Sequence, residues 1–307
     1  MSALGDCAEE YLSTRRALGY KLVKQARLVT QFVDHLDRLG ATRITTETAL
    51  SFAMNPENAQ PIWWQQRLSA VRGFACYMVT IDPATEVPPG NLLRGAVTRA
   101  VPYLYTSSEI IELMASTAVL RPVLRAATYE TLIGLLAVTG MRIGEAIALQ
   151  RDDVDLERGL ITIRFSKFDR ERLVPLHSST TAALGSYAAR RDERFPVRRA
   201  TTFFVSSRGT PLLHSGVQRS FATLVAKVGL QPRSPRCRPR VHDLRHRFAV
   251  ETLLGWYRSG EDVAAKLPVL STFLGHVKPR NTYWYLSATP ELLALAAARL
   301  EQSAVTS

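Results

Sequence analysis

The chain has 307 residues, of which 46% are hydrophobic and 21% are charged, a mixture typical of globular proteins that excludes an intrinsically disordered chain. Its 39 Lys and Arg residues outnumber its 27 Asp and Glu residues, so the formal net charge is +12. A surplus of this size favours a polyanionic partner such as nucleic acid, although a membrane surface is also polyanionic.

The three cysteines and the absence of long apolar segments indicate the cellular compartment. Cys7, Cys76 and Cys237 lie far apart and form no CxxC pair, which argues against a disulfide framework and a zinc knuckle. Acidic residues within the first ten positions argue against a signal peptide. The longest apolar stretch, around residues 131–138, is too short to span a bilayer. We therefore expect a cytoplasmic protein without a membrane partner.

Residues 1–90 have the pattern of a small domain made of four helices. Apolar residues recur at a helical spacing from Val23 to Leu39, and Gly40 follows as a C-cap. Thr45 or Thr46 can cap a short third helix, and Ile62 to Val79 forms the last and longest one. We predict an all-helical domain in this region.

A stretch rich in proline, glycine and isolated arginines, residues 82–102, follows these helices. This composition favours a connecting segment. We place the linker at residues 91–105 and a second domain at residues 106–307. Ser107 or Ser108 is expected to cap the first helix of this domain, beginning at Glu109.

The middle of the second domain predicts one apolar helix followed by a β-hairpin. Tyr129–Val138 is strongly apolar and is ended by Gly140. Leu160–Phe165 alternates between apolar and polar residues, and the segment RLVPL after it forms the partner strand. Lys167 then lies at the bend of the hairpin.

The remainder of the second domain is expected to be mainly helical. Residues 190–199 and 231–240 have the composition of basic, proline-containing loops, and helices are expected near residues 243–257, 267–274 and 290–301. The fold class is therefore multidomain: an all-α N-terminal domain and a mainly α, α+β second domain with a small antiparallel sheet.

The segment VHDLRHRFAVETLL contains the first candidate site. His242 and Arg245 are three residues apart at the start of a helix, so their side chains project to one side. The unpaired N–H groups of a helix N-terminus add a seat for phosphate. Taken alone, the pair also fits a capping histidine and a surface arginine.

The segment TGMRIGEAIAL contains the second candidate site. Arg142 follows Gly140 at a corner between two helices, and Glu145 lies three residues further, where it can orient the guanidinium. Taken alone, the two residues also fit a solvated ion pair.

The segment STFLGHVKPRNTYWYL contains the third candidate site. Gly275 and His276 end a helix, and Tyr285 lies nine residues beyond His276. Taken alone, His276 fits a helix cap, and Tyr285 fits an aromatic cluster with Tyr283 and Trp284.

These residues resemble the tyrosine recombinase (phage integrase) family by their order along the chain, which is Arg142, Lys167 in the hairpin, His242–x–x–Arg245, Leu274–Gly275–His276 and Thr282–x–x–Tyr285. The resemblance covers roughly residues 106–290, and the helical N-terminal region resembles the core-binding domain of the family by its pattern only. It implies an enzyme that cleaves and rejoins DNA through a covalent 3′-phosphotyrosyl link. The segment between the HxxR helix and Leu274–Gly275–His276 is longer than in the compact family pattern, which affects the expected helix boundaries there.

The resemblance also implies a role for each candidate residue. Arg142 and Arg245 would hold the non-bridging oxygens of the scissile phosphate, and His276 would donate a further hydrogen bond. Lys167 would protonate the departing 5′-oxygen, His242 would assist proton movement, and Tyr285 would be the nucleophile. Glu145 and Asp243 would support these groups.

Elementary chemistry agrees with these implied roles. Fixed donors stabilise the negative charge that develops on the phosphate oxygens. A phenol with a pKa of about 10 is roughly 0.1% ionised at neutral pH, which costs about 4 kcal/mol, and nearby guanidinium groups lower this cost. Since the cations are built in and the phosphotyrosyl link conserves the energy of the broken bond, we expect neither a metal nor another cofactor.

Two neighbouring residues offer alternatives within the site. Tyr283 competes as nucleophile, but only Tyr285 keeps the Thr-x-x-Tyr step. His246 lies four residues after His242, as in a metal-binding pair, but no intervening glutamate and no third ligand accompany them.

The partners implied are double-stranded DNA and further copies of the chain, as a tetramer on DNA during recombination or integration of a mobile element. The Ala- and Leu-rich tail after Tyr285 either folds back on its own domain or docks on a neighbouring subunit, and the resemblance favours docking. The competing functions are a type IB-like DNA topoisomerase and a catalytically silent DNA-binding regulator.

Overall fold

The structure is a computed structural model that describes residues 2–93, 100–164, 171–276, 278–287 and 289–306, without the side chains of 287 and 299–306. The chain divides into two compact units, Met1–Arg99 and Ala100–Ser307. The division falls inside the predicted linker, residues 91–105.

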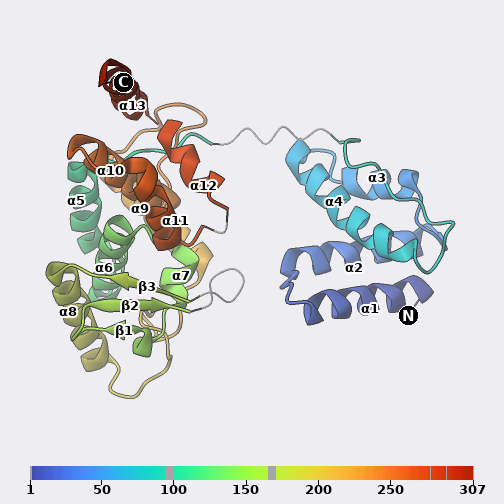
Figure 1. The fold of residues 1–307 in the computed structure, drawn as a ribbon. Helices are drawn as coiled ribbons and strands as arrows, with labels where there is room; N and C mark the ends of the chain where they lie inside the picture. Colours follow the sequence, from blue (N-terminus) through green and yellow to red (C-terminus); the bar gives the residue numbers. More distant parts are fainter. Residues whose placement is uncertain (1, 94–99, 165–170, 277, 288, 307) are drawn as a thin grey trace. The chain divides into compact units, whose positions relative to one another are not determined.

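The first unit is all-helical, as predicted (Figure 1). Its helices are α1 (Ala3–Ala17), α2 (Val23–Arg38), α3 (Thr46–Met54) and α4 (Pro61–Met78). The core is built from apolar side chains on the inner faces of these helices, among them Phe32, Phe52 and Phe74. Thr45 caps α3, because its hydroxyl accepts a hydrogen bond from the N–H of Thr48.

The second unit is mainly helical with one small sheet, which confirms the predicted fold class (Figure 1). Its α-helices are α5 (Ser107–Ser116), α6 (Val123–Thr139), α7 (Ile143–Ala148), α8 (Ser178–Arg194), α9 (His214–Val228), α10 (His242–Arg258), α11 (Val263–Leu274), α12 (Arg280–Tyr283) and α13 (Pro290–Thr306). Short 3-10 helices are η1 (Thr117–Val119), η2 (Arg151–Asp153) and η3 (Trp284–Ser287). The strands are β1 (Val154–Asp155), β2 (Leu160–Ile163) and β3 (Arg172–Pro175).

The sheet is antiparallel, with the strand order β1-β2-β3. Ile161 and Ile163 of β2 are buried, as their alternation predicted, and Ile161 pairs with the buried Val174 of β3. Strand β1 has two residues, too few to show an alternating pattern, and was not predicted. Phe165, the predicted end of the first strand, and the hairpin bend with Lys167 lie outside the described residues.

Two local predictions were wrong. Helix α5 begins at Ser107, and its cap is Thr106 rather than Ser107 or Ser108, because Thr106 and Glu109 each accept a hydrogen bond from the other's backbone N–H. The basic segment 190–199 is not all loop, since α8 continues to Arg194. Arg191 of that segment is buried and donates to the carbonyl oxygen of Phe203, so one arginine belongs to the core.

The corner between α6 and α7 brings the chain close to α10. Gly140 ends α6 with a positive φ of 59°. A Cβ atom there would lie 2.5 Å from Cδ1 of Phe248 on α10, so only glycine allows this close approach. The corner, the N-terminal half of α10 and the end of α11 therefore meet at one place.

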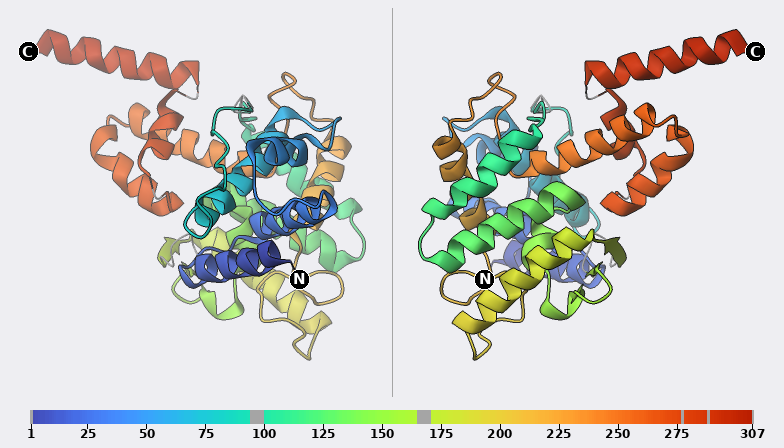
Figure 2. Two further views of the ribbon diagram at one scale, coloured as in Figure 1. Left: turned by 90° about the vertical axis from the view of Figure 1, so that its right-hand side faces the viewer. Right: turned by 90° about the vertical axis from the view of Figure 1, so that its left-hand side faces the viewer.

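The C-terminal helix α13 is anchored at its start. Leu292 is fully buried against the cluster formed by α10 and α11, and Arg258 of α10 forms an ion pair with Glu291. Leu295 in the second turn of α13 also packs against this cluster, and beyond it α13 extends away from α10 and α11 (Figure 2). In the part of the chain that is described, no helix is both long and apolar enough to cross a bilayer.

Candidate active site

Arg142 lies at the corner that Gly140 makes possible, as the N-cap residue of α7. Its Nη1 donates to Oε1 of Glu145 at 2.7 Å, and its backbone N–H donates to Oε2 at 3.0 Å. Its Nη2 donates to the carbonyl oxygen of Gly275 at 2.7 Å. About a third of the Arg142 side chain, 35%, remains exposed, so the guanidinium is fixed in place and still accessible to a ligand.

Arg245 lies in the first turn of α10 and is almost completely buried, with 2% exposed. Its Nη1 donates to the carbonyl oxygen of Gly140 at 2.7 Å, and its Nη2 donates to that of Leu274 at 2.6 Å. Burial, followed by the charge of Arg142, lowers the pKa of Arg245 to about 10. Arg245 therefore stays cationic at neutral pH. Because its charge lies buried near that of Arg142, the two positive charges repel each other unless an anion binds between them.

His276 follows the C-terminus of α11, where Gly275 adopts a positive φ of 65°. Its Nδ1 lies 2.8 Å from the hydroxyl of the buried Thr282. Burial, the charges of Arg245, Arg142 and Arg172, and His242 lower the pKa of His276 to about 3. The imidazole is therefore neutral at physiological pH and surrounded by cations.

Tyr285 lies in η3 beside this group of cations and is buried, with 2% exposed. Its hydroxyl lies 3.1 Å from Nδ1 of His246. Its ring is stacked on that of His276, with 6.1 Å between the ring centroids and 18° between the planes. Tyr285 lies close enough to Arg245 that an ionised phenol would raise the pKa of this guanidinium. Tyr283, the alternative nucleophile, is 53% exposed.

The remaining candidate residues from the sequence are His242, Asp243 and Lys167. His242 is exposed at the first position of α10, and its ring centroid is 4.8 Å from that of His246. Asp243 is fully buried and accepts two hydrogen bonds from Arg240, so it fixes the loop before α10 rather than a phosphate-binding group. Lys167 lies outside the described residues.

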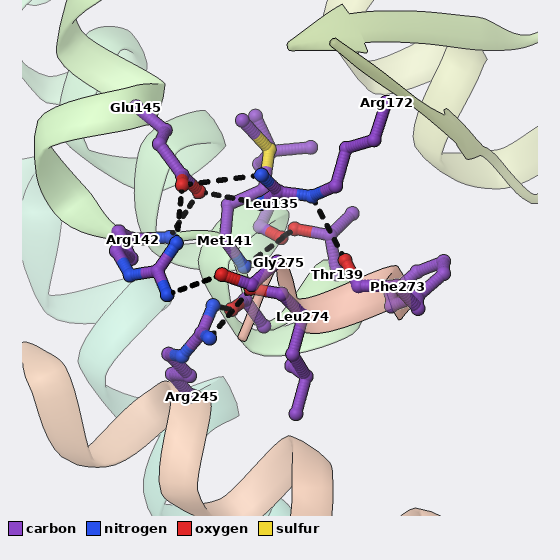
Figure 3. Close-up of polar contacts among 11 residues, drawn as sticks. Leu135, Thr139, Met141, Arg142, Glu145, Arg172, Arg245, Phe273, Leu274 and Gly275 are labelled. Carbon is purple, nitrogen blue, oxygen red and sulfur yellow. Dashed lines mark hydrogen bonds and ion pairs between the residues drawn. The ribbon is translucent and has the colours of Figure 1, made fainter. Parts of the chain in front are cut away.

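Two residues of this site were missed from the sequence. Arg172, the first residue of β3, donates to both oxygens of Glu145 and to the carbonyl oxygen of Phe273 (Figure 3). His246 contacts the phenol of Tyr285 but was considered only as a metal ligand. The sequence around Arg172 and His246 does not indicate these contacts, because strand register brings Arg172 to Glu145 and helix packing brings His246 to Tyr285.

The site is a cationic cluster built around one carboxylate. Burial opposes ionisation of Glu145, but the hydrogen bonds and charge of Arg172, followed by those of Arg142, outweigh it and lower its pKa. Among the residues described, no three His, Cys, Asp or Glu side chains gather as metal ligands do. Such a cluster of fixed N–H donors is suited to a phosphate group.

Sequence comparison places this chain in a known family. The sequence profile of the phage integrase family matches residues 105–291. The chain is 41% identical to the putative integrase/recombinase y4rB of Sinorhizobium fredii over 98% of both chains. It is 28% identical to the tyrosine recombinase XerD of Neisseria meningitidis, with 78% of this chain and 77% of that protein covered.

Solved structures show the same fold. The Tn1549 transposon integrase in complex with transposon right end DNA has a TM-score of 0.64 at 17% identity, covering 97% of this chain and 99% of that one. XerH site-specific recombinase bound to its difH substrate, in a post-cleavage complex, has a TM-score of 0.64 at 20% identity, covering 90% and 78%. With the family match over more than half of its length, the chain belongs to the phage integrase family, the tyrosine-type site-specific DNA recombinases.

Proposed function

We propose that the protein cleaves and rejoins double-stranded DNA with Tyr285 as its nucleophile. The phenolic oxygen attacks the scissile phosphorus, the bond from phosphorus to the 5′-oxygen breaks, and a 3′-phosphotyrosyl link forms. Attack by the 5′-hydroxyl of another strand reverses these changes and releases Tyr285. Because one phosphoester replaces another at each step, the reaction needs no external source of energy.

The convergence of side chains from three distant segments supports this proposal most strongly. Arg142 and Arg245 both hydrogen-bond to the backbone at the end of α11, at Gly275 and Leu274, and His276 follows directly. Tyr285 stacks on His276. The chain thus assembles the group of cations and the phenol within one subunit.

We assign Arg142, Arg245 and His276 to the non-bridging oxygens of the phosphate. These oxygens gain negative charge in the transition state, and a fixed donor lost from such a site typically costs about 3 to 4 kcal/mol of barrier. A hydroxyl of Thr282 that donates to Nδ1 of His276 leaves the imidazole proton on Nε2, where a phosphate oxygen can accept it. A neutral histidine with a pKa of about 3 is suited to donate without taking up a proton.

We assign proton transfers to Lys167 and His242. Lys167 protonates the departing 5′-oxygen, an assignment that rests on the sequence resemblance. His242 is exposed at the N-terminus of α10 and has His246 between it and Tyr285 in a chain of ring contacts. This position supports His242 as the group that exchanges protons between solvent and the nucleophile.

We further propose that the protein acts in the cytoplasm as a tetramer on DNA, with α13 docking on a neighbouring subunit, and serves a mobile element. Names of the relatives support this reading: one is a putative integrase/recombinase and another a transposon integrase bound to transposon end DNA. The length of α13 beyond Leu295, the last of its residues that packs against the cluster formed by α10 and α11 among those with described side chains, supports docking between subunits.

Trapping on a nicked suicide substrate tests the chemistry. The wild type should form a covalent protein–DNA adduct on its own site, and Tyr285→Phe should form none while binding DNA unchanged. Tyr283→Phe, which alters an exposed hydroxyl two residues away, is the matched control and should react like the wild type. An adduct with Tyr285→Phe would show that the nucleophile is another residue.

Intact DNA substrates, a pair of DNA molecules and a supercoiled plasmid, separate the competing functions. Joining of strands from two DNA molecules indicates recombination, whereas relaxation of supercoils alone indicates a topoisomerase. A wild type that binds its site and never forms an adduct would be a regulator. Arg142→Ala and Arg245→Ala should each reduce cleavage far more than DNA affinity, and equal losses would assign both to binding only.

A further inference from the structure

Arg172 makes three hydrogen bonds at the start of β3 and is 9% exposed (Figure 3). Its Nη2 donates to Oε2 of Glu145 at 2.6 Å and its Nη1 to Oε1 at 3.2 Å, the forked arrangement that guanidinium and carboxylate groups favour. Its Nε donates to the carbonyl oxygen of Phe273 at 2.9 Å. One side chain therefore ties β3 both to Glu145 and to the last turn of α11.

The charge balance around Glu145 gives this contact a consequence for catalysis. The carboxylate is 7% exposed and bonds to Arg142 and Arg172 at once. With Arg142 alone, carboxylate and guanidinium would cancel, and little positive charge would remain for a phosphate. A second guanidinium neutralises Glu145 and leaves the charge of Arg142 available.

The contact to Phe273 has a geometric consequence. Phe273 precedes Leu274 and Gly275, whose carbonyl oxygens accept from Arg245 and Arg142. Three arginines from three elements thus hold three successive carbonyl groups at the end of α11. A shift of this turn would move both phosphate-binding guanidinium groups and His276 together.

We propose that Arg172 is a positioning residue for strand cleavage, which neutralises Glu145 and fixes the end of α11 so that Arg142 and His276 face the scissile phosphate. The inference rests on the proposed function of Arg142 and His276. Arg172 itself does not touch the phosphate. Its removal should slow cleavage and leave DNA affinity nearly unchanged.

A charge-rescue series tests this proposal. Arg172→Met, Arg172→Lys, Glu145→Gln and the double variant Arg172→Met/Glu145→Gln are compared with wild type for the rate of adduct formation at saturating nicked DNA. Arg172→Met should be slower by about a hundredfold, the size of effect typical for a lost charge-stabilising group. Arg172→Lys keeps the charge without the fork and should lie between. In the double variant, no carboxylate opposes Arg142, so the rate should recover at least tenfold.

Arg151→Met is the matched control. Arg151 is 10% exposed and pairs with the half-exposed Asp192, so this variant also loses a largely buried arginine that pairs with a carboxylate, but one that makes no contact with Arg142 or Glu145. It should cleave at the wild-type rate in the folded fraction. A loss equal to that of Arg172→Met would mean that both variants report only lost stability.

A neutral substrate supplies an independent measurement. A methylphosphonate at the scissile position replaces one charged oxygen with a methyl group, so the site needs less positive charge. The loss caused by Arg172→Met should then shrink by at least tenfold. An unchanged loss on this substrate, together with no recovery in the double variant, would overturn the inference. If instead Tyr285→Phe forms an adduct, the proposed function fails, whatever the Arg172 series gives.

Discussion

The hydroxyl of Tyr285 lies 3.1 Å from Nδ1 of His246, which is the residue that directly follows Arg245 on α10. The helix that carries Arg245, which we assign to the phosphate, therefore also contacts the proposed nucleophile. His246 is buried, and its ring lies between those of His242 and Trp284. The orientation of the phenol is thus set by a packed imidazole rather than by solvent.

This contact predicts that His246→Phe slows strand cleavage. Phenylalanine fills the same place without a ring nitrogen, so the phenol loses one partner that orients it. A hydrogen bond of about 1 kcal/mol corresponds to a loss of about fivefold in the rate of adduct formation. DNA affinity should not change. Faster cleavage by His246→Phe would instead mean that the contact holds Tyr285 back in the absence of DNA.

The hydrogen bond between Thr282 and His276 predicts a second effect on cleavage. Thr282 is 1% exposed, and Thr282→Val has nearly the same shape but no hydroxyl. The variant should form the adduct about threefold to tenfold more slowly, because the imidazole is less firmly oriented. Thr282→Ser retains the hydroxyl and should be closer to wild type. Equal rates of adduct formation for Thr282→Val and Thr282→Ser would show that the hydroxyl does not contribute to cleavage.

Gly275 predicts a large loss from a single added methyl group. A Cβ atom at this position would lie 2.6 Å from Nη1 of Arg172 and 3.3 Å from Nη1 of Arg142. Gly275→Ala should therefore displace the guanidinium groups and slow adduct formation at least tenfold. The positive φ adds about 1 kcal/mol of strain.

Gly229→Ala is the control for that strain. Gly229 ends α9 with a φ of 79°, and nothing lies within 4 Å of an added Cβ atom there. Both variants should lose similar stability in thermal melts, but only Gly275→Ala should lose cleavage. Equal rates of cleavage by Gly275→Ala and Gly229→Ala would show that the close contacts around Gly275 do not matter for cleavage.

The lowered pKa of His276 predicts a pH-dependent contribution to stability. Its pKa is about 3 in the folded chain and near 6.5 when unfolded, so between these values the unfolded chain binds a proton that the folded chain does not. The contribution is complete above pH 6.5 and decreases as the pH falls toward 3. Since His276 is only partly buried, we expect about 1 kcal/mol between pH 7 and pH 5, less than the pKa difference alone implies.

Denaturant unfolding at pH 7 and pH 5 measures this effect. Wild type should lose about 1 kcal/mol more between the two pH values than His276→Gln, which has no titrating ring. In an NMR titration, the His276 ring should show no transition between pH 5 and pH 8. A transition near pH 6.5 would contradict a neutral, desolvated imidazole.

Local patterns in the sequence were sufficient for most helices and for the hairpin strands. Apolar spacing predicted α2 and α4, and strict alternation predicted the buried face of β2. Signals that depend on distant contacts were missed. The cap of α5 was misplaced because three neighbouring residues, Thr106, Ser107 and Ser108, can all cap a helix, and only the reciprocal bonds with Glu109 select among them. Helix α8 was not predicted, and its last residues were assigned to a loop because its arginines look like those of a solvated loop.

The sequence by itself determined the class of chemistry, because Arg142, His242, Arg245, His276 and Tyr285 have a spacing and order that resemble one enzyme family. Tertiary structure alone decided which other groups surround them. Arg172 reaches Glu145 across 27 positions of the chain and Phe273 across 101, and His246 reaches Tyr285 across 39. Such contacts arise from packing between elements, and a charge or a ring in the sequence does not indicate which distant partner will neutralise or orient it.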